Sequence, residues 1–369
     1  MKLTKICAIA LATVGLGGAL ADTLFSKAPH SIIPVTNIPV TIAPISAARA
    51  QEPLVPVTIA FISDQGVGPF AEDVLATVKK EGTDLLLIQG GLGYGGSPQE
   101  WQAMIDAALG TDFPVLASVG DHDIKQDDKP KDSHNGHWLG DGGYQEILER
   151  RLTRVDEMGC DGQIGVQATC QFQGIQIVLS GIGTLPDQLD DQDHVSYLAE
   201  AFQSSTARWR ICSWHKVQHL IQVGEQKDET GWRVYDTCRR AGAIIATGHQ
   251  HNYSRTHLMS DFANQQIGSV EDTLYLSPGR SFAFVSGLGG KSISGGGRAE
   301  GRDNPWWAKV YAPKETKTST DRKVDDVTYG ALFCTFFAQG QPERADCRFK
   351  TIDGTQEDKF TVITRVGGL

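Results

Sequence analysis

An apolar run followed directly by two histidines is the feature that most constrains how this 369-residue chain folds. Residues 243–246 have the composition of a short buried strand, and the segment Gly248–His251 follows them at once. Open α/β proteins bind ligands beyond the carboxyl ends of their strands. We therefore expect His249 and His251 at such an edge, where two neutral imidazoles suit a transition metal. Taken alone, the motif also fits a pair of solvated or locally hydrogen-bonded histidines.

The same arrangement recurs at four apolar runs upstream. Each run has the length and composition of a buried strand and ends in side chains with oxygen or nitrogen donors. The run at residues 57–62 leads into Asp64, and the run at 84–88 leads into Tyr94. The run at 113–119 leads into Asp121, His122 and Asp123, and the run at 209–214 leads into His215. If five strands bring these donors to one edge, they form a cluster of the kind that holds two metal ions.

The order and spacing of these segments resemble the motifs of the calcineurin-like metallophosphoesterases, especially the purple acid phosphatase branch of secreted bacterial type, over residues 57–362. The resemblance implies an α/β fold, a four-layer α-β-β-α sandwich of two mixed sheets. It also implies a metal-dependent hydrolase of phosphate esters, in which a metal-bound hydroxide attacks phosphorus in line. The implied cofactors are one or two divalent or trivalent ions of Fe, Zn or Mn, and the substrate is a phosphoester.

The resemblance also implies which residues bind metal. Carried over position by position, it assigns Asp64, Tyr94 and His251 to the first ion. His215 and His249 correspond to ligands of the second ion. A phenolate such as that of Tyr94 suits a hard trivalent ion, although a buried, hydrogen-bonded tyrosine is the alternative.

Two positions depart from the family pattern. Gly91 stands where the family has the Asp that bridges both ions, and Asp121 stands where it has a metal-binding Asn. The two exchanges together keep the formal charge but not the geometry. We hypothesise that Asp121 partly compensates, so that a weakened two-metal site or a single-metal site remains. The alternative is a degenerate fold without turnover that binds phosphate or a protein partner.

Four further residues are candidates for the chemistry around the metals. His122 is the candidate that protonates the leaving oxygen or holds the substrate, with Asp123 fixing its tautomer, because imidazole titrates near neutral pH. A structural role is the alternative for His122. Lys216 and Arg255 are candidates for holding phosphate oxygens, although charged residues beside strand ends are commonly solvated.

The N-terminal segment predicts export. Two lysines precede an apolar run from residue 6 to residue 20, which ends at small residues typical of a signal-peptide cleavage site. We expect a signal peptide at residues 1–21, a Pro-rich linker at 22–56 and a catalytic domain at 57–369, in a secreted or periplasmic protein. The rest of the chain has no run approaching the roughly 20 apolar residues of a membrane span.

Six cysteines follow the predicted signal peptide, and an even number in an exported chain favours disulfides. We expect Cys160 to pair with Cys170 and Cys334 with Cys347, because each pair brackets a short segment with glycine turn signals. Cys212 and Cys238 either bond or remain buried thiols.

The formal net charge of −10 argues against a nucleic-acid-binding surface, which needs basic patches. An anionic phosphoester is then attracted locally, by the metal ions. The sequence identifies no protein partner.

The remaining periodic segments complete the expected fold. Helical patterns occupy residues 70–81, 98–109, 143–154 and 230–241. Strand-like segments at 272–276, 282–285, 329–337 and 360–364 suit the second sheet that the resemblance implies. Between them, the long segment 289–327 is expected to be a lid, a partner surface or a plain exposed loop.

Overall fold

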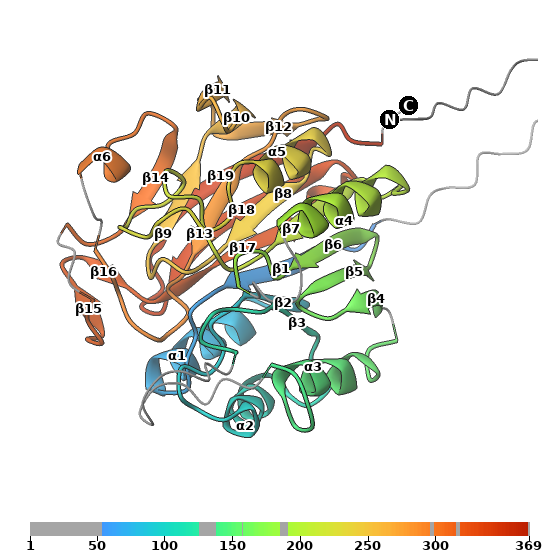
Figure 1. Ribbon diagram of the computed structural model, residues 1–369. Coiled ribbons are helices and arrows are strands. Elements are labelled where there is room, and N and C mark those ends of the chain that lie inside the picture. The colour runs from blue at the N-terminus through green and yellow to red at the C-terminus, as the bar shows by residue number, and fades with distance from the viewer. Residues whose placement is uncertain are drawn as a thin grey trace, which may run out of the picture. The chain divides into compact units, whose positions relative to one another are not determined.

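The computed structural model describes residues 54–124, 138–156, 158–184, 191–295, 299–314 and 318–367. The expected signal peptide and the expected linker up to residue 53 lie outside these residues. Within them, two large mixed β-sheets form the centre of the domain (Figure 1). The part of the chain that the structure describes contains no helix long and apolar enough to cross a membrane.

The first sheet has seven strands in the order β12-β19-β18-β17-β1-β2-β3. Strands β1, β2 and β3 run parallel, and β1 pairs antiparallel with β17 on its other side. In chain order, the strands are β1 (Val57–Ile62), β2 (Leu85–Gln89), β3 (Val115–Ser118), β12 (Thr273–Leu276), β17 (Gly330–Phe336), β18 (Arg344–Thr351) and β19 (Gln356–Thr364). Every residue of β1 and β2 is buried, as expected for strands covered on both faces.

The second sheet has eight strands in the order β14-β9-β13-β8-β7-β6-β5-β4. Its central strands β6, β7, β8 and β13 are parallel. The strands are β4 (Met158–Gln163), β5 (Gln167–Phe172), β6 (Ile175–Ser180), β7 (Trp209–Ser213), β8 (Ile244–Thr247), β9 (Tyr253–Thr256), β13 (Ala283–Ser286) and β14 (Trp307–Tyr311). Two small ribbons pair β10 (Leu258–Asp261) with β11 (Gln266–Ser269), and β15 (Lys323–Val324) with β16 (Val327–Thr328).

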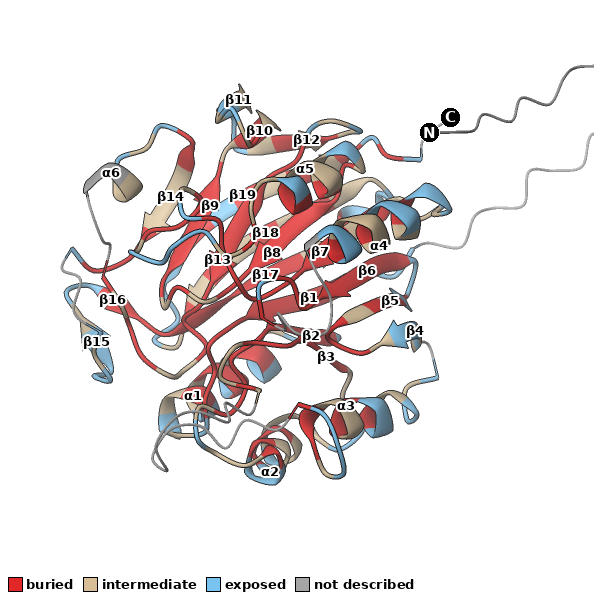
Figure 2. Cartoon of the chain, in the orientation of Figure 1, coloured by how far each residue is buried: buried red, intermediate tan, exposed pale blue. Residues whose placement is uncertain are grey.

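Helices cover the outer face of each sheet (Figures 1 and 2). Helices α1 (Pro69–Lys80) and α3 (Tyr144–Leu152) pack on the first sheet, and α2 (Pro98–Leu109) packs against both of them. Helices α4 (Asp191–Gln203) and α5 (Arg233–Arg240) pack on the second sheet. The short helix α6 spans Ala299–Arg302, and the 3-10 turn η1 spans Ala338–Gly340. The predicted four-layer α-β-β-α sandwich of two mixed sheets is therefore confirmed.

Aromatic side chains fill the space between the two sheets. Phe61 of β1 meets Phe284 of β13 edge to face, with ring centroids 5.2 Å apart. Tyr253 of β9 stacks on Phe349 of β18 at 4.1 Å. Buried aromatic pairs of this kind add about 0.5–1.5 kcal/mol beyond the area they bury. The sheets are thus held face to face, which fixes how the ends of their strands meet.

Local sequence explains where α2 begins. The Ser97 hydroxyl accepts a hydrogen bond from the backbone N–H of Glu100, while the Glu100 carboxylate accepts one from the N–H of Ser97. Pro98 follows at the first helical position, where a backbone N–H would have no partner within the helix, so that its absence costs no hydrogen bond. The helix predicted over residues 98–109 is confirmed with both bounds.

One expectation about the C-terminal half is wrong. We expect the segment 282–285 beside 329–337 in one sheet, but β13 pairs with β8 and β9 of the second sheet, whereas β17 pairs with β1 of the first. For the segment 289–327, the structure excludes one of the three alternatives, a plain loop, because the segment contributes β14, which pairs antiparallel with β9. Both findings concern pairing between distant segments, which periodicity along the chain does not encode.

Three disulfides crosslink the described residues. Cys160–Cys170 joins β4 to β5, and Cys334–Cys347 joins β17 to β18, so both predicted pairs are confirmed. Cys212–Cys238 joins β7 to α5 across 26 residues, which settles the pair that the sequence left open. Disulfides in these numbers are typical of proteins that fold in an oxidising compartment.

Arg255 forms a buried ion pair that ties the two sheets together. Its guanidinium Nε and Nη2 donate to the Asp358 carboxylate at 2.7 and 3.1 Å, and Tyr253 Oη donates to the same carboxylate at 2.7 Å. The guanidinium carbon also lies 4.0 Å from the centre of the Phe360 ring. The hypothesis that Arg255 holds phosphate oxygens is therefore wrong, because its side chain is buried in the core and already paired.

Removing one partner of this ion pair should destabilise the domain strongly. We expect Arg255→Met to lower the free energy of unfolding by about 3–5 kcal/mol, because the Asp358 carboxylate stays buried without its partner. The double variant Arg255→Met/Asp358→Leu should recover most of that loss in urea denaturation. Arg322→Met is the matched control, since the Arg322–Asp73 pair is exposed and should contribute less than about 1 kcal/mol. Equal losses in the single and double variants would contradict this account.

Candidate metal centre

The predicted donors follow strands of both sheets, and these strand ends meet. Asp64 follows β1 of the first sheet, and His249 follows β8 of the second. The backbone N–H of His249 donates to Asp64 Oδ2 at 2.9 Å, which joins the two sheets at this point. Nearby, the Ser118 hydroxyl at the end of β3 donates to the carbonyl of Ser213 at the end of β7, at 2.9 Å.

Asp64, Tyr94 and His251 form what we call the first donor set. Tyr94 Oη donates to Asp64 Oδ1 and lies 3.0 Å from His251 Nε2. His251 Nε2 lies 3.4 Å from Asp64 Oδ1. Ligand atoms about 2.1 Å from one ion lie roughly 3–3.5 Å from each other. The two distances to His251 match this spacing, and an ion bound here would replace the hydrogen bond between Tyr94 and Asp64.

Asp121, His215 and His249 form the second donor set, whose ligand atoms lie within 4.8 Å of one another. Asp121 Oδ1 lies 3.0 Å from His215 Nε2 and 3.8 Å from His249 Nδ1. His215 Nδ1 lies 2.7 Å from the carbonyl oxygen of Gln89, a contact that orients the ring with Nε2 toward Asp121. This set also has the donor types and spacing for one ion, and His215 Nε2 is 4.0 Å from Asp64 of the first set.

Backbone strain marks the same place. Asp64, Tyr94 and His249 all have positive φ, at 57°, 50° and 67°. Residues other than glycine seldom adopt this left-handed conformation, which costs on the order of 1–3 kcal/mol and concentrates at functional sites. The Tyr94 hydroxyl and the His249 N–H both donate to the Asp64 carboxylate, so the three residues are in contact. The surrounding fold therefore holds their unfavourable backbone conformations in place.

Electrostatics inside the cluster shifts several pKa values. Burial alone would raise the pKa of Asp64, but His251 and His215 outweigh it and hold the pKa well below its usual range. The pKa of Asp121 is lowered for the same reason, with His215 as its main partner. Burial would lower the pKa of His215, but its hydrogen bond to Asp121 and the charge of Asp64 raise it to about 9.

The structure places His122 and Asp123 beside the first donor set. The His122 ring stacks on Tyr94 with ring centroids 4.2 Å apart. The Asp123 carboxylate accepts three backbone hydrogen bonds, from Gly91 at 2.8 Å, Leu92 at 2.7 Å and Gly120 at 2.9 Å. Asp123 thus ties together the loops that follow β2 and β3. The catalytic role of His122 stays a prediction.

Gly91 leaves no room for the carboxylate that the family has at this position. A Cβ atom there would lie 2.9 Å from Asp64 Cα and 2.9 Å from Tyr94 Cε2, and φ is +72°. Only glycine fits this close approach without a shift of the neighbouring backbone. The loop after β2 therefore has a conformation that leaves no space for a bridging side chain at position 91.

Lys216 and Glu229 contact the second donor set. Lys216 Nζ donates to Asp121 Oδ2 and to Glu229 Oε1, both at 2.9 Å, and lies 3.2 Å from His249 Nε2. Glu229 Oε2 lies 3.2 Å from His249 Nε2. Sequence reasoning placed Lys216 at the site as a phosphate-binding candidate, but its ammonium group is already paired. Glu229 was missed, because it lies in a loop without any motif.

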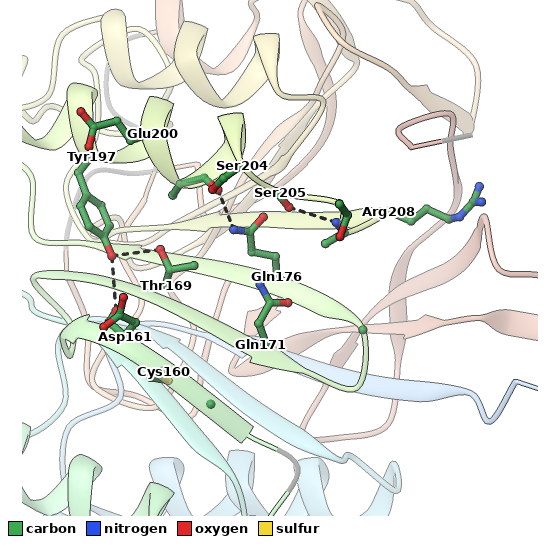
Figure 3. Close-up of a pocket in the computed structure, with 15 residues that line it drawn as sticks. Cys160, Asp161, Thr169, Gln171, Gln176, Tyr197, Glu200, Ser204, Ser205 and Arg208 are labelled. Carbon is green, nitrogen blue, oxygen red and sulfur yellow. Dashed lines mark hydrogen bonds between the residues drawn. The ribbon is translucent and has the colours of Figure 1, made fainter. Parts of the chain in front are cut away.

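Two hollows bear on ligand access. One of about 220 Å³ opens beside His249 and His251 and is lined mainly by polar residues. A wider groove of about 960 Å³ lies between β4–β6 and α4, where Tyr197 Oη is 3.0 Å from Thr169 Oγ1 (Figure 3). None of the donor residues lines the wider groove. Of these two hollows, only the smaller one is lined by donor residues, namely His249 and His251.

Comparison with known proteins supports the fold. No family model matches the chain, and no curated protein matches it in sequence. Among solved structures, a purple acid phosphatase isolated from yellow lupin (Lupinus luteus) seeds is similar, with a TM-score of 0.61 and 15% identity over 84% of this chain. The chain spans about half, 54%, of the length of that phosphatase. GAP50, the anchor in the inner membrane complex of Plasmodium, has a TM-score of 0.50 and 9% identity, covering 84% of this chain and 89% of GAP50. The fold is therefore that of the metallophosphoesterase sandwich.

Removing the Tyr94 hydroxyl should weaken metal binding. We expect Tyr94→Phe to lower the affinity for Zn²⁺ or Mn²⁺ at least about tenfold, because one of the three atoms of the first donor set is lost. Isothermal titration calorimetry of the metal-free protein measures this directly. Tyr197→Phe removes a hydroxyl from the groove of Figure 3 and should leave the affinity unchanged. An unchanged affinity in Tyr94→Phe would exclude Tyr94 as a ligand.

The raised pKa of His215 predicts a pH-dependent stability of the metal-free protein. The folded state, with a pKa of about 9, binds this proton more tightly than the unfolded chain, whose histidine titrates near 6.5. The resulting stabilisation is fully present below pH 6.5 and is lost as the pH rises through about 9. In urea denaturation, the free energy of unfolding of native protein should therefore fall relative to that of His215→Gln between pH 6.5 and about 9. If the difference in unfolding free energy between the two proteins does not change with pH, the pKa of His215 is not raised.

Proposed function

We propose that this chain is a metal-dependent hydrolase of phosphate esters that works outside the cytoplasm, as a secreted or periplasmic enzyme. The observation that carries the proposal is the first donor set. Asp64, Tyr94 and His251 come from three separate loops, yet their ligand atoms lie within 3.4 Å of one another. The metallophosphoesterase fold around them supports the same function, and the three disulfides support an oxidising compartment.

The surrounding residues hold the first donor set in place. Asp64 Oδ2 accepts hydrogen bonds from the Ser63 hydroxyl at 2.6 Å and from the N–H of His249, so Oδ1 stays directed at Tyr94 and His251. Ser292 Oγ contacts His251 Nδ1, which leaves Nε2 as the ligand atom. An ion bound here supplies a Lewis acid for the phosphoryl group and lowers the pKa of water. Iron, zinc and manganese are the candidate metals.

Two side chains beside Tyr94 are suited to handle the substrate. His122 stacks against the phenol ring and is the proposed group that protonates the leaving oxygen or holds the phosphate. Lys291 Nζ lies 5.1 Å from the centre of the same ring. This ammonium group attracts an anionic ester locally, although the whole chain carries a net charge of −10.

A second candidate function is binding without turnover. The absence of a side chain at Gly91 favours it, because two ions about 4 Å apart repel each other strongly without an anion between them. In this case the chain keeps the fold and binds phosphate or a protein partner. Turnover assays distinguish the two functions.

Hydrolysis of p-nitrophenyl phosphate and bis-p-nitrophenyl phosphate, with Zn²⁺, Mn²⁺ or Fe ions added, tests the proposal. We expect native protein to turn over at least one of these esters in a metal-dependent way. His251→Ala should lower kcat/KM by at least about 100-fold, because the first donor set loses a ligand. Tyr197→Phe serves as the matched control. Native protein that binds metal yet hydrolyses neither ester would favour binding without turnover.

A further inference from the structure

We infer that the Lys216 ammonium is a built-in cation that takes the place of a second metal ion, so that this chain binds a single ion tightly, at the first donor set. The inference deepens the proposed function and rests on it for the ion at Asp64, Tyr94 and His251. It concerns only the side chains of this chain around the second donor set.

The contacts of Lys216 are those of a fixed counter-ion. Its side chain is 6% exposed, and its ammonium group meets Asp121, Glu229 and His249 at 2.9, 2.9 and 3.2 Å. The two carboxylates accept hydrogen bonds from this ammonium group, whereas the role of His249 Nε2 depends on the tautomer of its ring. The lysine is therefore held by two carboxylates of the protein itself.

Lys216 neutralises the carboxylate that would otherwise attract a second ion. Asp121 stands where the resembling family has an uncharged Asn, and its Oδ2 is ion-paired with Lys216. Glu229 shares the same ammonium group, so Lys216 offsets one of two carboxylates. The hypothesis of charge compensation by Asp121 alone is therefore incomplete, because Lys216 and Glu229 also set the charge beside the second donor set.

Two independent features thus work against a second ion. At Gly91 there is no space for a bridging carboxylate, since a Cβ atom would already lie 2.9 Å from Asp64 Cα. At Lys216 a positive charge contacts two of the three residues of the second donor set, Asp121 and His249. A dication held by those residues would be repelled by the ammonium group and would lack a bridging carboxylate at position 91.

Metal titration of variants tests this inference without relying on turnover. Metal-free protein is titrated with Zn²⁺ in a calorimeter, and bound ions are counted by elemental analysis after dialysis. We expect native protein to bind one ion per chain and His251→Ala to bind none. Lys216→Met should bind two ions, because Asp121 and Glu229 lose their counter-charge. The double variant His251→Ala/Lys216→Met should bind one.

Controls and thermal unfolding separate the possible outcomes. Lys227→Met removes an exposed lysine near the same loop and should leave one ion bound. Metal-free Lys216→Met should have a lower Tm than native protein and should regain it with Zn²⁺. Native protein that binds two ions with similar affinity would overturn the inference, even if Lys216→Met fails to fold. So would a Lys216→Met variant that binds metal more weakly than native protein, because Lys216 would then only position Asp121.

The same experiment distinguishes this inference from the proposed function. If native protein binds no ion but Lys216→Met binds one, the ion at the first donor set and the metal-dependent function both fail, and only the role of Lys216 at the second donor set is supported. If native protein binds one ion but hydrolyses no ester, the inference holds and only the hydrolytic function fails.

Discussion

The contacts of the buried Asp64 carboxylate are the interaction on which the candidate site depends. Asp64 follows β1 of the first sheet, and its Oδ2 accepts the N–H of His249, which follows β8 of the second sheet. Its Oδ1 accepts the Tyr94 hydroxyl and lies near His251. A wholly buried carboxylate is tolerated only when it is fully paired. The pairing of Asp64 therefore fixes the loops of both sheets relative to one another.

The charge arrangement around this carboxylate separates the chain from the dinuclear pattern that it resembles. Gly91 brings backbone, not an anion, close to Asp64. Asp121 is negative, but Lys216 offsets it, and Glu229 binds the other side of the same ammonium group. These features are mutually consistent, because the lack of a bridging anion and the presence of an ammonium group both weaken the binding of a second metal ion.

The sequence predicted the parts of the structure that local pattern controls. Buried strands, their polar ends and the start of the helix that Ser97 caps follow from composition and capping over a few residues. The resemblance supplied the four layers. What the sequence did not predict depends on contacts between distant segments. The pairing of β13 with β8, the ion pair between Arg255 and Asp358, and the approach of Glu229 to Lys216 leave no periodic signal in the chain.

Anomalous diffraction from crystals of native protein grown with Zn²⁺ or Mn²⁺ tests the central claim most directly, because it locates and counts ions independently of activity. We predict one strong peak, within about 2–2.3 Å of Asp64 Oδ1, Tyr94 Oη and His251 Nε2, with Lys216 Nζ still bound to Asp121. Two peaks of equal height, one between His215 and His249, would contradict the account. So would the absence of any peak at the first donor set.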